Sequence, residues 1–180
     1  MKLVSLIICS LLPLSAQATN LVATTSIEEK DCVTIASDSL DEEPEVDYYQ
    51  GECQGLGGYR VYVEGGDLRY NINLGYGNTK IDLIAPPSFH SPVGSKVYWT
   101  YERNDEGVSY NAFVYTMSYQ SYDTVDEIPV DREVAYIVRL DKESSCVVDV
   151  VIDETPLLEK ALTKAQNVKG KPCIKQTGVN

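Results

Sequence analysis

Apolar and polar side chains alternate through the middle of the chain, and this period of two is typical of strands with one buried face. Residues 68–74 show the alternation clearly, and the glycine turn before them links them to a similar run over residues 59–63. The two runs predict an antiparallel hairpin. A turn at residues 75–78 leads into residues 79–84, and residues 85–94 and 120–132 are predicted loops. Further strands are predicted over residues 96–103, 109–119, 133–140 and 146–152.

The pattern changes to a helical one only near the end of the chain. The apolar stripe consists of Leu157, Leu158, Ala161, Leu162, Ala165 and Val168. Thr155 can cap this helix, Pro156 suits its first position, and Gly170 can end it. We therefore expect one α+β domain over residues 19–180, with a mostly antiparallel β-sheet and a C-terminal helix packed on it.

The first eighteen residues have the three parts of a secretory signal peptide. Lys2 supplies the positive start, residues 3–14 form an apolar run, and Ala16-Gln17-Ala18 is a small-x-small cleavage pattern. The apolar run is shorter than the roughly 20 residues that a bilayer-spanning helix needs. We expect cleavage after Ala18, a periplasmic or secreted location, and no membrane insertion of the processed chain.

The chain is strongly acidic, with 27 Asp and Glu against 15 Lys and Arg. Nucleic acid is disfavoured as a partner because phosphate contacts need Lys or Arg. Anionic lipid surfaces would repel the chain for the same reason. A basic protein would instead be attracted over a long range. The alternative interpretation is that the acidity only keeps an exported protein soluble.

Four cysteines remain after processing: Cys32, Cys53, Cys146 and Cys173. An even number in an exported protein predicts two disulfides, and four cysteines allow three connectivities. We favour Cys32–Cys53 and Cys146–Cys173, because each pairing closes a short local loop. A zinc site lacks the close Cys-x-x-Cys spacing that it would need. We therefore expect no metal and no cofactor.

The stretch GECQGLGGYR, residues 51–60, resembles a phosphate-binding loop at first sight. A dinucleotide fingerprint needs its glycines between a strand and a helix, with the phosphate at the helix N-terminus. Here the residues that follow predict a strand. We interpret the stretch as a turn held by a disulfide, in which the glycines allow backbone conformations that other residues resist.

Candidate catalytic groups are few. His90 is the only histidine, no Gly-x-Ser-x-Gly elbow presents a serine, and we expect His90 to be an exposed loop residue. Paired carboxylates could serve a glycoside hydrolase, although 27 acidic residues make some such pair inevitable. The acidic run at residues 38–47 lacks the alternating ligands and sharp-turn glycine of a calcium loop. No catalytic residue is predicted.

Asp149 interrupts the apolar run at residues 146–152, so its charge must be paired or reach solvent. Arg69 and Arg139 are the candidate partners. The alternative to a functional site is an Asp at a sheet edge or bulge. Asp67 and Arg69, which follow Gly65-Gly66, are expected to form a pair that stabilises the turn.

The chain has thirteen Tyr against two Phe. Tyrosine combines apolar area with a polar tip and is common at recognition surfaces. The alternative is a solvated sheet face with the hydroxyl groups in water. The predicted binding face consists of aromatic residues on two neighbouring strands and the loop after them: Tyr98, Trp99, Tyr101, Tyr110, Tyr115, Tyr119 and Tyr122.

Several short motifs resemble those of a group of uncharacterised exported (periplasmic) proteobacterial proteins. The shared residues are Cys32, the Gly51-x-Cys53-x-Gly55-x-Gly57-Gly58-Tyr59 turn, Gly66-Asp67-Leu68-Arg69, Ser145-Cys146-Val147-Val148 and Cys173. The resemblance implies export and two disulfides, and it implies no activity.

These observations lead us to expect a non-enzymatic binding protein. A specific form is an inhibitor or immunity-type protein whose acidic and aromatic surface blocks a basic cell-wall enzyme such as a lysozyme. The expected partner is thus a basic protein, or a cell-wall glycan. The alternatives are a carboxylate-based hydrolase of cell-wall glycan and a structural component of the envelope.

Overall fold

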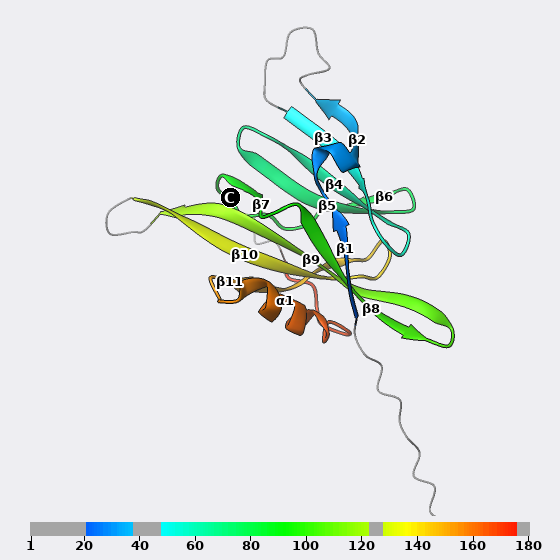
Figure 1. The fold of residues 1–180 in the computed structure, drawn as a ribbon. Helices are drawn as coiled ribbons and strands as arrows, with labels where there is room; N and C mark the ends of the chain where they lie inside the picture. Colours follow the sequence, from blue (N-terminus) through cyan, green and yellow to red (C-terminus); the bar gives the residue numbers. More distant parts are fainter. Residues whose placement is uncertain (1–20, 38–47, 123–127, 176–180) are drawn as a thin grey trace, which may run out of the picture.

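The computed structural model describes residues 21–37, 48–122 and 128–175, and it is mostly β-sheet with a single α-helix in these ranges (Figure 1). The helix lies near the C-terminus and packs on the sheet, so the predicted fold class is confirmed. The predicted signal peptide (residues 1–18) and the acidic run at residues 38–47 lie outside the described residues.

The strands fall into two halves of one sheet. The first half comprises β2 (Cys32–Ser37), β3 (Tyr48–Gln54), β4 (Tyr59–Gly66), β5 (Arg69–Tyr76), β6 (Thr79–Ile81) and β7 (His90–Pro92). The second half comprises β1 (Leu21–Ser26), β8 (Lys96–Asn104), β9 (Gly107–Tyr122), β10 (Pro129–Arg139) and β11 (Cys146–Ile152). A short 3-10 helix, η1 (Glu29–Asp31), precedes β2, and α1 (Leu157–Ala165) follows β11.

The long strand β9 joins the two halves. Along one edge it pairs with β10 over residues 112–122, and along the other it pairs first with β8 and then with β7. Strand β7 in turn bridges to β5 through the parallel pair Arg69 and His90. The other strand pairs between described residues are antiparallel.

Two apolar clusters give the molecule three layers. The larger cluster draws Val61 and Leu74 from the first half and Trp99 and Phe113 from the second, so the two halves face each other across it. The smaller cluster lies on the opposite face of β9, β10 and β11, where Ala161 of α1 is fully buried. Figure 1 shows α1 lying along β10 and β11, away from the first half. No described helix is long and apolar enough to cross a bilayer.

The predicted strands are all found, but several others were missed. Strand β3 has the sequence YYQGECQ and β7 is only HSP, and neither shows an apolar alternation. Residues 120–132, predicted as a loop, contain the end of β9 and the start of β10. These strands exist because long-range pairing supplies their hydrogen bonds, and tertiary context overrides local preference in strands.

Both predicted disulfides are present. Cys32–Cys53 joins directly paired residues of β2 and β3, and Cys146–Cys173 ties the start of β11 to the chain beyond α1. The predicted cap of the helix is wrong, because α1 begins at Leu157 with Pro156 at the cap position and no side-chain cap. The helix ends at Ala165, before the turn at Gly170.

Candidate functional site

The glycine stretch at residues 51–60 is a strand connection. It runs from β3 through a short turn into β4, so a strand follows it where a phosphate loop would have a helix. Gly57 has a φ of +64°, and a Cβ there would lie 2.6 Å from Cδ2 of Tyr110. Backbone conformation and close packing therefore explain this glycine without a ligand.

His90 is buried, which corrects the expectation of an exposed loop histidine. It lies in β7 between β5 and β9, and only 7% of it is exposed. Its Nε2 lies 3.1 Å from Oδ1 of Asn71, and its Nδ1 contacts the Ser88 carbonyl. The ring thus satisfies polar groups within its own sheet, and we assign it a structural role.

Asp149 pairs with lysines, not with Arg69 or Arg139 as predicted. Its carboxylate accepts hydrogen bonds from Lys171 at 2.7 Å and from Lys164 at 3.5 Å. Burial disfavours the charged carboxylate, but the hydrogen bonds from Lys171 and the Val150 N–H outweigh burial and lower the pKa of Asp149. Arg69 instead pairs with Asp67 at 2.9 Å, as expected. Asp149 therefore anchors α1 and the following segment to β11.

The seven predicted aromatic residues do not form one exposed face. Trp99 and Tyr115 are fully buried between the two sheet halves, so neither can contribute to a binding face. Tyr98 packs on the opposite side of the sheet, against the cluster beneath α1. The cause is the alternation of faces along a strand, which sends neighbouring side chains to opposite layers.

The remaining four aromatic residues are separated along β8 and β9. Tyr101 and Tyr110 are half-buried, with ring centroids 5.6 Å apart. Tyr119 is half-buried near the far end of β9, and Tyr122 is exposed at that end. Of the seven, Tyr119 alone lines the cavity described below that adjoins the candidate site.

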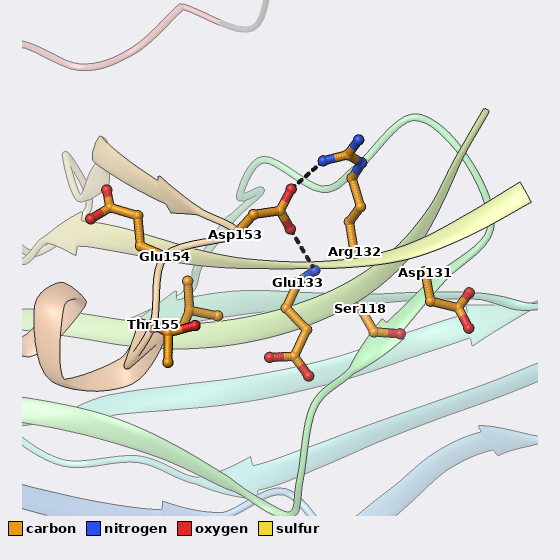
Figure 2. A pocket seen from close by; sticks show the side chains of 8 residues that line it. Ser118, Asp131, Arg132, Glu133, Asp153, Glu154 and Thr155 are labelled. Carbon is orange, nitrogen blue, oxygen red and sulfur yellow. Dashed lines mark hydrogen bonds and ion pairs between the residues drawn. The ribbon is translucent and has the colours of Figure 1, made fainter. Parts of the chain in front are cut away.

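The candidate site is a groove of about 710 Å³ on the helix-bearing face of the sheet (Figure 2). Helix α1 packs on this face over Ala135 and Ile137 of β10, whereas the residues at the start of β10 are exposed. There, alternation along β10 turns Asp131 and Glu133 to the same face as the buried Ala135. We call this site the acidic groove; it is lined by Ser118, Asp131, Arg132, Glu133, Asp153, Glu154, Thr155 and Leu157.

Two of the four carboxylates in the acidic groove are paired. Asp153 accepts a hydrogen bond from the Arg132 guanidinium, and its other oxygen lies 3.4 Å from the Glu133 backbone N–H (Figure 2). Glu154 pairs with Lys160 of α1 at 2.9 Å, and the hydrogen bond and charge of Lys160 lower the pKa of Glu154. Among the described residues, the side chains of Asp131 and Glu133 form no ion pair.

A second cavity, of about 260 Å³, adjoins the acidic groove and shares Ser118 and Asp131 with it. Its other walls are largely apolar and include Leu68, Phe89 and Tyr119. We call it the Leu68 cavity. The two hollows together offer a partner an acidic end and an apolar end.

The arrangement suits recognition of cations borne by a partner. In the described part of the chain, no three His, Cys, Asp or Glu residues come together as metal ligands would. Comparison of the chain with family models, curated proteins and solved structures finds no match. The site must therefore be interpreted from its own residues.

Sequence reasoning missed the acidic groove. Its carboxylates come from two places, β10 and the connection between β11 and α1, and Ser118 comes from β9. The available signal was the cluster of Asp131 and Glu133, which fell in and beside a predicted loop. Only the pairing of β9 with β10 brings these residues together on one face.

Proposed function

We propose that this chain is an exported, non-enzymatic binding protein whose acidic groove receives basic side chains of a partner protein. An inhibitor or immunity-type protein acting on a basic cell-wall enzyme is the specific form of the proposal. The observation that carries it is the pair of exposed carboxylates at Asp131 and Glu133, which have no ion pair among the described residues. Such carboxylates are available to Lys or Arg of a partner.

The charge of the whole chain supports the same partner. The formal net charge is −12, so a basic protein is attracted before contact and a correct encounter is favoured. Complementary charge of this kind acts mainly on the association rate and on partner choice. The acidic groove then supplies the local contacts that a diffuse negative charge lacks.

Export is part of the proposal. Two disulfides favour an oxidising compartment, because cytosolic thiols are kept reduced. The N-terminal apolar run and its small-residue cleavage pattern support a signal peptide. A periplasmic or secreted location would place the chain where cell-wall enzymes act.

Two alternatives receive less support. A carboxylate-based hydrolase needs a carboxyl that stays protonated near neutral pH, and enzymes obtain it by burial. The four groove carboxylates are exposed, and the pKa of Glu154 is lowered. For a structural envelope component we find no supporting feature among the described residues, and salt separates it from the proposed function, because ionic binding to a basic protein weakens as salt screens the charges.

The test is binding of the processed protein to basic cell-wall hydrolases, lysozyme first, at about 20 mM and about 300 mM salt. The groove variant Asp131→Asn/Glu133→Gln should weaken binding about tenfold at low salt, since each lost ionic contact contributes up to about 1 kcal/mol. The control variant Asp105→Asn/Glu106→Gln removes the same charge at the opposite end of β9 and should bind like the unmodified protein. If no basic protein binds at low salt, the proposed function is wrong.

A further inference from the structure

The turn between β4 and β5 has an unusual residue at its second position. Asp67 and Leu68 form a two-residue connection in which both φ angles are positive, +51° and +62°. This geometry is that of a type I′ hairpin turn, which favours Asn or Asp followed by Gly. A leucine in the left-handed region is strained, because its Cβ approaches the backbone closely.

Burial of apolar area does not compensate for this strain, since 64% of Leu68 is exposed. The turn is nevertheless held firmly. The Leu68 carbonyl accepts a hydrogen bond of 3.0 Å from the His90 N–H. Arg69 binds Asp67 at 2.9 Å and lies 4.8 Å from the ring centre of Phe89. The backbone of Leu68 is therefore held in place while its apolar side chain is presented to solvent.

Leu68 belongs to an apolar patch that adjoins the acidic groove. Phe89 is 37% exposed beside it, and both residues line the Leu68 cavity. This cavity reaches Asp131, which also lines the acidic groove. An exposed apolar group beside a carboxylate matches a partner surface that carries an apolar side chain next to a Lys or Arg.

We propose that Leu68 is the apolar anchor for the basic partner protein. An apolar side chain of the partner enters the Leu68 cavity against Leu68 and Phe89, while a neighbouring Lys or Arg reaches Asp131. A rigid anchor loses little freedom on binding, which explains why a strained leucine is held in this turn. A second copy of this chain is a poor occupant, because its own charge is −12 and it would meet Asp131 with repulsion. The proposal rests on the proposed function.

The decisive variant is Leu68→Gly, which should change stability and binding in opposite directions. Glycine accepts the positive φ without strain, so the melting temperature should rise by about 2–5 °C. Loss of the anchor should weaken binding to lysozyme, or to whichever basic hydrolase binds in the test above, about tenfold at both low and high salt. Leu68→Asn tolerates the same φ without the flexibility of glycine and should also weaken binding, whereas Leu68→Met should retain it.

The outcomes separate this inference from the proposed function. If Leu68→Gly binds normally while Asp131→Asn/Glu133→Gln binds weakly, the anchor is wrong and the acidic groove stands. If Leu68→Gly lowers the melting temperature, the strain argument is wrong. If no basic protein binds and the chain instead is retained on insoluble cell-wall glycan through Leu68, the protein partner is wrong for both proposals.

Discussion

At the scale of single residues, Asp149 shows how an apolar strand tolerates a charge. Strand β11 is apolar elsewhere, and Asp149 pairs with Ile137 directly beside a register shift between β10 and β11. The carboxylate is about a quarter exposed and lies within reach of two lysine ammonium groups. Pairing of this kind avoids the large penalty of an isolated buried charge.

Replacing Asp149 with Asn should lower the free energy of unfolding by about 1 kcal/mol at pH 7, because the charged hydrogen bonds are lost. The folded-state pKa of Asp149 lies below its ordinary value. Its contribution is therefore present above the unfolded-state pKa and is lost as the pH falls through the folded-state pKa. Urea unfolding of both proteins should show a difference at pH 7 that disappears in acid. Asp105→Asn, in the exposed hairpin, serves as the control, and a difference that persists in acid would indicate lost packing.

The sequence indicated that Asp149 needed a partner, but it could not identify one. The two lysines are 15 and 22 residues away, on α1 and on the segment after it. Their positions depend on how α1 lies across the sheet, which local periodicity does not determine. For the same reason the sequence could not show that Trp99 and Tyr115, on β8 and β9, are covered by the first sheet half.

At the scale of elements, the two disulfides brace opposite parts of the fold. Cys32–Cys53 joins an end strand, β2, to β3. Cys146–Cys173 closes a segment of 27 residues that contains α1, and the Ile174 N–H adds a hydrogen bond of 2.8 Å to the Val147 carbonyl. Helix α1 has only nine residues, which is too short to be stable alone.

Removal of the second disulfide should destabilise the protein substantially. The chain-entropy account gives about 3 kcal/mol for a loop of this length. The variant Cys146→Ser/Cys173→Ser should therefore unfold at a lower urea concentration, and its far-ultraviolet circular dichroism should show loss of helix before loss of strand. Cys32→Ser/Cys53→Ser should lower the free energy of unfolding similarly while keeping the helix until the end. Identical behaviour of the two variants would contradict this division of roles.

The strands that the sequence predicted well are those with one apolar face. Strands β4, β5, β8 and β9 were located because their alternation is strong. The hairpin of β4 with β5 turns at Asp67 and Leu68, later than the predicted glycine turn, so Leu68 lies in the turn and not in the strand. Strands β1, β2 and β3 were not predicted. They lie toward the ends of the sheet, and β3 carries few apolar residues. The local alternation of apolar and polar residues identifies the strands that build the core. It misses strands that form only because a neighbouring strand supplies their hydrogen bonds.

At the scale of the whole molecule, excess negative charge should weaken the folded state through self-repulsion. About 0.15 M salt reduces the screening length to about 8 Å, which suppresses repulsion between distant carboxylates. The melting temperature should therefore rise between low salt and 0.15 M salt, as differential scanning calorimetry can measure. A fall would show that attractive pairs such as Arg132 with Asp153 outweigh the repulsion.

The position of strand β9 limits how the molecule can unfold partially. It is shared by both sheet halves, and Met117 on it pairs with β7 on one side and β10 on the other. Separation of the two halves would break the pairing of β7 with β9 and expose the larger apolar cluster, so we expect partial opening to begin at the ends of the sheet. The amide protons near Met117 should thus be among the last to exchange with heavy water, at a rate set by complete unfolding.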